Sequence, residues 1–460
     1  MRATINEVQK KNYTWIIVLI LIIVPMVLEF FFGEYLYNIT HDDIIKSQEF
    51  TYEKLNLKVF DNSEDSPGKN NEDSIASDIF ITEFFHVINS NGFYIFLVAF
   101  LYNFMNVYKI FLLYITIFLS NLLSSTLSYL YQFPKPYMAF YKVKSVVFFN
   151  EWASPNNQLV LLIAFGGSFY KTLVANKTCE KKRWIKLIII FVILLYWFFD
   201  GFFLFASGNL AYNEIILSTF IGVAIFLFIF YCFPIELNKP KQFYDFMKFN
   251  VYYWIIINLL ILTFQILLSF FITDRRDTEY YNNNLKIQAE RLPQNDFTKD
   301  YLKYRNLFSL NLGNICNVTS FLMNIIAFLS VKADIKFNYK NSYNTWSEGN
   351  FEIPIMGGGI VDGDQSGLIE YNAIEKTQWN HNNCGIIIIR TIIDFIFNVI
   401  IFVLFIWLAH FFDNETVLFI FLIILPMILC IFGNLFFFKA LYMKMKLAIK
   451  PNIKMKSLLY

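Results

Sequence analysis

Charged residues, glycine and proline are all scarce in this chain, and each scarcity excludes a class of protein. Only 16% of the 460 residues are charged, whereas soluble proteins carry about 25%, so an ordinary soluble domain is excluded. With 17 Gly and 11 Pro, collagen-like and linker-rich proteins are excluded as well. The 38 Lys and Arg nearly balance the 36 Asp and Glu, and the net charge of +2 gives no reason to expect a nucleic-acid partner.

Cysteine is also scarce, and its positions exclude the usual cysteine chemistry. The five residues are widely separated and form neither a Cys-x-x-Cys pair nor a cluster with histidine: Cys179, Cys232, Cys316, Cys384 and Cys430. An odd number cannot pair completely into disulfides. We therefore expect no disulfide framework, no structural metal and no cofactor.

Hydrophobic residues are abundant, at 57% of the chain, and they come in runs long enough to cross a membrane. A transmembrane helix needs about 20 consecutive apolar residues. The runs predict an all-α, polytopic membrane protein with about ten spans, at residues 14–33, 88–106, 109–131, 158–176, 184–206, 212–233, 251–273, 307–330, 386–410 and 417–438.

The charges between the spans predict the orientation of the chain in its membrane. Basic residues in 1–13 precede the first span and the acidic connection 34–77 follows it, so the positive-inside rule places the N-terminus on the cytosolic or matrix side. Counting ten spans places two basic loops, 177–186 and 234–249, and the C-terminal tail on that same side. The outer connection 34–77 is expected to be a solvated loop with a short helix near 44–56.

Three regions follow from this arrangement. Residues 1–83 hold the first span and the acidic outer loop, and residues 84–235 hold spans two to six. Residues 236–460 form a four-span membrane extension with two long polar connections, 274–306 outside and 331–385 inside. No internal repeat of the kind found in secondary transporters is present in the sequence.

Polar segments between the second and sixth spans carry a recognisable order of motifs. They read Phe-Phe-His-Val-Ile-Asn-Ser-Asn-Gly-Phe-Tyr at 84–94, Phe-Pro-Lys-Pro-Tyr-Met at 133–138, Glu-Trp-Ala-Ser-Pro-Asn-Asn-Gln at 151–158 and Ser-Gly-Asn-Leu-Ala-Tyr-Asn-Glu at 207–214. In this order and spacing the chain resembles the type 2 phosphatidate phosphatases, a family of integral membrane lipid phosphatases. The resemblance covers about a third of the chain and implies a helical bundle whose motif loops meet at its outer face.

The resemblance also implies a phosphate site, and this sequence departs from it at nearly every catalytic position. In that family lysine and arginine hold the phosphate, one histidine attacks phosphorus, and a second histidine donates a proton to the leaving group. Here Ser128 and Lys135 stand at the positions of the phosphate-binding lysine and arginine, and Gln158 stands at the position of the proton-donating histidine. The position of the attacking histidine holds Asn209 or Leu210, and the position of a further arginine that precedes it holds Phe203 or Leu204.

These departures predict a catalytically inactive relative of the lipid phosphatases. The residues expected to line its remnant phosphate or lipid pocket are Lys135, Pro136, Asn156, Asn157, Gln158, Asn209 and Glu214. Such a protein would bind membrane lipids or act as a structural membrane subunit. The alternative is an accessory subunit of a large organellar complex of the respiratory type. An active phosphatase or a transporter is disfavoured, because the ionisable groups or repeats that either needs are missing.

One further pair of charged residues lies inside a predicted span. Arg390 and Asp394 are four residues apart in the ninth span, one turn from Asn398, and charged groups at that depth are costly. We interpret them as an intrahelical ion pair near the inner end of the span. The alternative is a charged helix of the kind that conducts protons.

Overall fold

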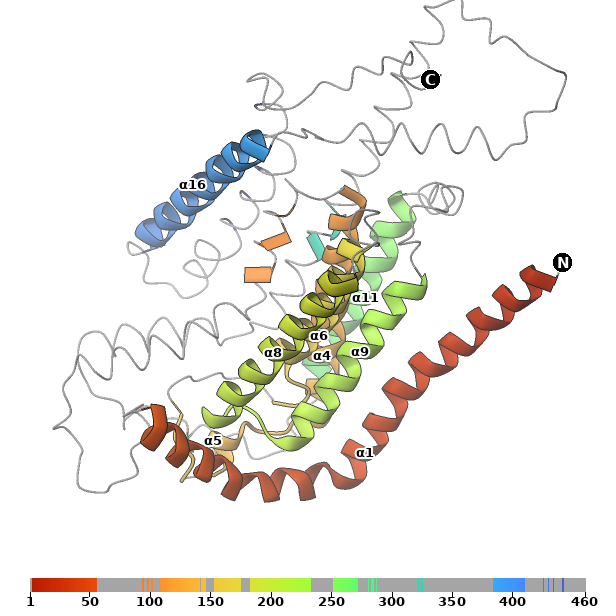
Figure 1. Ribbon diagram of the computed structural model, residues 1–460. Helices are drawn as coiled ribbons and strands as arrows, with labels where there is room; N and C mark the ends of the chain where they lie inside the picture. The colour runs from red at the N-terminus through yellow and green to blue at the C-terminus, as the bar shows by residue number, and fades with distance from the viewer. Residues whose placement is uncertain are drawn as a thin grey trace, which may run out of the picture. The chain divides into compact units, whose positions relative to one another are not determined.

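In the computed structural model every described element is a helix (Figure 1). The structure describes residues 2–55, 93–94, 97–98, 101, 107–140, 142–145, 153–174, 183–232, 251–271, 280, 283–284, 287, 321–322, 324–325, 384–409, 425, 429, 433 and 441. Its helices are α1 (Arg2–Leu55), α4 (Val107–Tyr131), α5 (Pro136–Ala139), α6 (Asn157–Val174), α8 (Arg183–Ala206), α9 (Tyr212–Cys232), α11 (Val251–Phe271) and α16 (Cys384–Ala409).

The chain divides into two compact units. Unit 1 comprises residues 1–94, 115–233 and 259–321. Unit 2 comprises residues 95–114, 234–258 and 322–460. All of the motif segments that the structure describes belong to unit 1, where α6 and α9, α1 and α9, and α6 and α8 pack against one another.

Four helical segments within the described residues are long and apolar enough to cross a membrane: Ile16–Lys54, Lys109–Ala139, Lys186–Ala206 and Tyr212–Phe230. The prediction of an α-helical membrane protein is confirmed at this level. Six predicted spans coincide closely with helices; α4, for example, covers Val107–Tyr131 where 109–131 was expected. The total of about ten spans stays a prediction, because 88–106, 307–330 and 417–438 lie largely outside the described residues, as do the loops 274–306 and 331–385.

The prediction of a solvated loop over 34–77 is wrong for residues 34–55, because α1 continues without a break to Leu55. Only the segment near 44–56 was expected to be helical. The residues that α1 buries beyond its apolar run recur every three or four positions, as on one face of a helix: Tyr37, Thr40, Ile44, Gln48 and Thr51. Three of these five are polar, so the hydrophobic pattern alone did not reveal the helix.

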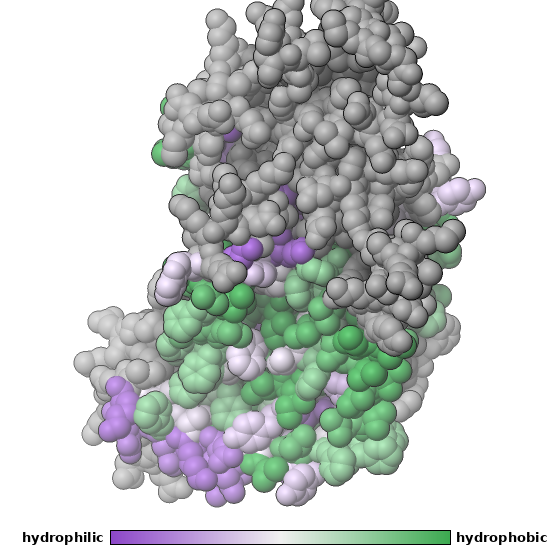
Figure 2. All heavy atoms as spheres, turned by 45° about the vertical axis from the view of Figure 1, so that its right-hand side comes forward, coloured by the Kyte–Doolittle hydropathy of each residue, from purple (hydrophilic) through white to green (hydrophobic). Residues whose placement is uncertain are grey.

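Helix α1 is bent, and its second half passes across the end of the bundle (Figure 1). Pro25 lies inside the helix, where its missing N–H removes one backbone hydrogen bond and favours a bend. On the face drawn in Figure 2, hydrophobic residues form a broad band and hydrophilic ones gather at the lower end. On the second half of α1, Asp42, Lys46 and Glu49 are exposed.

The bundle interior is held by a close helix contact. A Cβ atom at Gly222 on α9 would lie 2.8 Å from Cβ of Ile163 and 2.9 Å from the carbonyl oxygen of Val160 on α6. Only glycine fits a contact of that kind, which is typical of helices packed in membranes.

Polar side chains join α4 to α6. Thr116 Oγ1 donates to Ser168 Oγ (3.1 Å), and Ser124 Oγ donates to Asn157 Oδ1 (2.6 Å). Asn157 Nδ2 in turn donates to Asn121 Oδ1 (3.0 Å). Because buried polar groups in a membrane need partners from the protein, these bonds fix how the two helices face each other.

Candidate functional site

The motif loops meet at one end of the bundle in unit 1. The backbone N–H of Ala153, in the segment before α6, donates to the carbonyl of Phe133 (2.7 Å) in the segment after α4. The N–H of Tyr137 donates to the carbonyl of Gly208 (3.3 Å), in the turn between α8 and α9. Segments far apart in sequence are therefore joined, which is the geometry that the resemblance implied.

Glycine is required at position 208, in the motif segment 207–214. Gly208 has φ of +69°, in the left-handed region that residues with a Cβ rarely adopt. A Cβ at this position would also lie 2.6 Å from Cγ1 of Val143. The turn at residue 208 can therefore approach Val143, which follows the motif segment 133–138, only because it has no side chain.

Asn156 has a structural role in this cluster. Its Oδ1 accepts the backbone N–H of Leu159 (3.1 Å), so it caps the first turn of α6. Its own backbone N–H donates to Ser218 Oγ (2.8 Å) on α9. Asn157, as described above, is bonded to α4. Two of the amides expected to line a pocket therefore hold helices together.

A carboxylate from the first span completes the cluster. Glu29 on α1 is only 4% exposed, and its Oε1 accepts hydrogen bonds from Ser154 Oγ and from Asn213 Nδ2, both at 2.8 Å. Ser154 belongs to the motif segment 151–158 and Asn213 to the segment 207–214. An acidic side chain of the protein itself thus binds between two motif segments.

The two ionisable residues that the sequence placed in the pocket are buried as well. Lys135 is 5% exposed and Glu214 is fully buried. Glu214 is close enough to Lys135 for the two side chains to interact electrostatically. The cation expected to attract phosphate is therefore buried beside an acidic residue of the same chain.

Two leucines are among the candidates for the positions where the resemblance places histidine and arginine. Leu204 and Leu210, one of the two candidates for each position, are buried together with Leu159 in a hydrophobic cluster. Asn209, the other candidate nucleophile, donates from Nδ2 to Ser207 Oγ (2.9 Å). The three leucines are therefore part of the hydrophobic core.

The remaining predicted positions lie nearby. Pro136 is buried in the first turn of α5, where its fixed φ suits a helix start. Gln158 is partly buried in the first turn of α6. Ser128 Oγ donates to the carbonyl of Ser125 (2.9 Å) within α4. The structure therefore brings all seven predicted pocket residues to one end of unit 1.

The second half of α1 covers this cluster, and we call residues 29–51 the α1 clamp. Tyr37 Oη donates to the carbonyl of Pro134 (2.7 Å). Gln48 Nε2 donates to the carbonyls of Lys144 (2.6 Å) and Ala206 (2.9 Å), and its Oε1 accepts the N–H of Lys144 (3.2 Å). Helix α1 is therefore hydrogen-bonded to the chain between α4 and α6 and to the last residue of α8.

Apolar and further polar contacts complete the α1 clamp. Ile44 is fully buried against Tyr137, Met138 and Val143. Thr40 Oγ1 accepts the N–H of Tyr212 (3.2 Å), which lies in the first turn of α9. The α1 clamp therefore contacts the segment 137–143 and the start of α9.

Sequence reasoning missed the contribution of α1 to the site. Glu29 lies at the end of the first apolar run, so it resembled a residue that marks the membrane interface. Gln48 lay in a stretch with the composition of a solvated loop. No hydrophobic period marks the buried face from Tyr37 to Thr51, because three of its five residues are polar.

The charged pair of the ninth span lies in unit 2. Arg390 and Asp394 are both 1% exposed on α16, and the ion pair between them stays a prediction. No group of three or more potential metal ligands occurs among the residues that the structure describes. Comparison with protein families, curated proteins and solved structures finds no match for this chain.

Proposed function

We propose that this chain is a non-catalytic, structural membrane protein, built on a lipid-phosphatase-like bundle of about ten spans with both termini on the cytosolic or matrix side. In this proposal the remnant phosphate site no longer binds a headgroup. It serves instead as the polar attachment of α1 to the end of the bundle.

The bonding of Glu29 carries the proposal. Its carboxylate binds between the Ser154 and Asn213 side chains, in the cluster where the resemblance places the phosphate. A phosphate that entered would have to displace a buried side chain of the protein that already has its hydrogen bonds. Catalysis would in addition need a nucleophile, and the candidates are an amide and a buried leucine, Asn209 and Leu210.

Phosphate release from phosphatidate tests the proposal directly. The full-length protein in mixed micelles of detergent and phosphatidate should release no phosphate above the buffer rate, and Lys135→Ala should not change the result. Release that depends on Lys135 would overturn the proposal.

Accessibility of Lys135 provides a second measurement. An amine-reactive reagent read by mass spectrometry should modify Lys46, whose side chain is 73% exposed, and should leave Lys135 unmodified. Glu29→Ala should increase modification of Lys135, because it removes the carboxylate that joins α1 to two motif segments. Equal modification of both lysines in the unmodified protein would contradict a closed cluster.

A specific observation favours an accessory subunit of a larger membrane complex as the second candidate. Helix α8 buries only 11% of its most apolar stretch, and its exposed residues include Trp184, Phe191 and Phe198. In a membrane this aromatic face contacts either lipid or helices of other subunits. Native mass spectrometry after mild detergent extraction separates the two, because a subunit would be released within a much heavier particle.

A further inference from the structure

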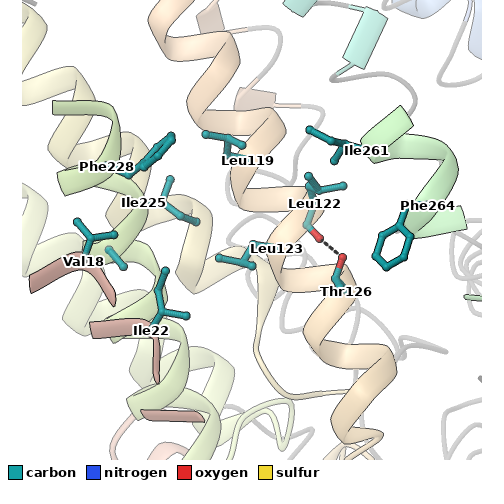
Figure 3. A pocket seen from close by; sticks show the side chains of 11 residues that line it. Val18, Ile22, Leu119, Leu122, Leu123, Thr126, Ile225, Phe228, Ile261 and Phe264 are labelled. Carbon is teal, nitrogen blue, oxygen red and sulfur yellow. Dashed lines mark hydrogen bonds between the residues drawn. The ribbon is translucent and has the colours of Figure 1, made fainter. Parts of the chain in front are cut away.

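Unit 1 contains an apolar groove that the candidate site does not use (Figure 3). Its volume is about 290 Å³, and it is open on one side rather than enclosed. Its lining comes from α1 (Val18 and Ile22), α4 (Leu119, Leu122, Leu123 and Thr126), α9 (Ala224, Ile225 and Phe228) and α11 (Ile261 and Phe264).

The groove lies at a different depth from the polar cluster. At 1.5 Å of rise per residue, Ile22 is about 10 Å along α1 from Glu29, and Ala224 is about 15 Å along α9 from Glu214. Both positions are inside segments apolar enough to cross a membrane. The medium that faces the groove is therefore the hydrocarbon of the bilayer, well away from the headgroups.

The groove has a buried floor and an exposed edge. Val18, Ala224 and Ile225 on α1 and α9 are buried, whereas Ile261 and Phe264 on α11 are 38% and 64% exposed. Figure 3 shows side chains of α9 and α11 approaching α4 from its two sides. A molecule in the surrounding membrane can therefore reach the floor past the α11 edge.

The lining contains one polar side chain, and its hydrogen bond is already made. Thr126 Oγ1 donates to the carbonyl of Leu122 (2.7 Å), the dashed line in Figure 3. A headgroup, a sugar or a water molecule placed here would lose its hydrogen bonds. The groove therefore selects a purely hydrocarbon occupant.

We propose that this groove binds one acyl chain of a bilayer phospholipid. A transmembrane helix of a partner is the other hydrocarbon occupant to consider, and it has a diameter of about 10–12 Å with its side chains. A groove of about 290 Å³, lined by α1, α4, α9 and α11, has room for a flexible hydrocarbon chain but is too small to seat such a helix.

A photoactivatable phospholipid tests this proposal. The full-length protein is placed in phosphatidylcholine nanodiscs containing a phosphatidylcholine with a diazirine on its acyl chain, and labelled positions are read by mass spectrometry. We expect labelling of 119–126 and 261–264 well above that of the exposed face of α8. Labelling no stronger than on α8, as when a helix of another chain occupies the groove and excludes lipid, would overturn the proposal.

A matched pair of variants makes the test specific. Thr126→Phe puts a ring into the groove and should reduce its labelling at least fivefold. Thr219→Phe is the control, since Thr219 is also a partly buried threonine that donates to the carbonyl four residues earlier, that of Ile215 (2.6 Å), but it does not line the groove. Unchanged labelling in Thr126→Phe would contradict acyl-chain binding. The comparison with α8 in the unmodified protein stands even if this variant does not fold.

Discussion

The two halves of α1 are held in place by different interactions. The apolar stretch of the first half, residues 16–28, has no charged side chain, yet most of its large side chains are exposed, among them Ile16, Ile20 and Val24 at about half of their surface. The second half carries the charges of a solvated segment, yet one face of it is buried and hydrogen-bonded to three other parts of unit 1. Apolar composition therefore indicates where α1 meets the bilayer, whereas hydrogen bonds and a narrow buried face indicate where it meets the protein.

The sharpest test of this comparison replaces the same residue type in each half. Ile44→Ala should destabilise the folded protein by about 3 kcal/mol, because it leaves a cavity against Tyr137, Met138 and Val143. Ile20→Ala should cost less than about 0.5 kcal/mol, because Ile20 is 52% exposed and contacts the surrounding apolar medium in either case. Denaturant unfolding in mixed micelles measures both values, and equal losses would show that the two halves are held alike.

The next largest effect is expected from the amide at the end of the α1 clamp. Gln48→Ala should cost about 2 kcal/mol, because it leaves a buried N–H and two carbonyls of the partner segments without their hydrogen bonds. Glu49→Ala is the control, since Glu49 is exposed on the adjacent position of the same helix. In the same unfolding measurement, a Gln48→Ala value as small as that of Glu49→Ala would mean that these bonds do not fasten the helix.

The smallest effect is expected where the α1 clamp meets water. Asp43 Oδ2 accepts a hydrogen bond from Tyr212 Oη (2.9 Å), and Lys46 lies 3.3 Å from Oδ1. Because these groups are exposed, Asp43→Ala should cost no more than about 0.5 kcal/mol. The loss should shrink further in high salt. A loss comparable to that of Gln48→Ala would show that the charged edge, and not the buried face, holds α1.

The sequence allowed most of the helices and the order of the site segments to be predicted, since both depend on local signals. Runs of about 20 apolar residues locate α4, α8 and α9, and the turn residues around Pro136 and Gly208 locate the motif loops. The α1 clamp could not be predicted in the same way. Its partners for Gln48 are backbone groups of Lys144 and Ala206, and any residue type offers those groups, so no sequence pattern points to them.

The sequence allowed us to predict which reactive groups the site lacks, but not which groups take their place. Substitution at Gln158 or Leu210 removes a reactive group, which is visible from the residue type alone. What replaces that group depends on three-dimensional packing. Leu204 and Leu210 came together with Leu159 as a hydrophobic cluster, and Glu29 joined from a different region of the chain.

The separation of Glu29 from its partners also bears on how the protein is made. Ser154 and Asn213 follow Glu29 by 125 and 184 residues, so the ribosome delivers the first span long before the groups that bind its carboxylate. Until α9 is made, Glu29 lacks its Asn213 partner and Thr40 lacks the N–H of Tyr212. Attachment of α1 is therefore completed late in biogenesis, and a chain truncated before Tyr212 would keep the bonds of Tyr37 and Gln48 but lose those that α9 supplies.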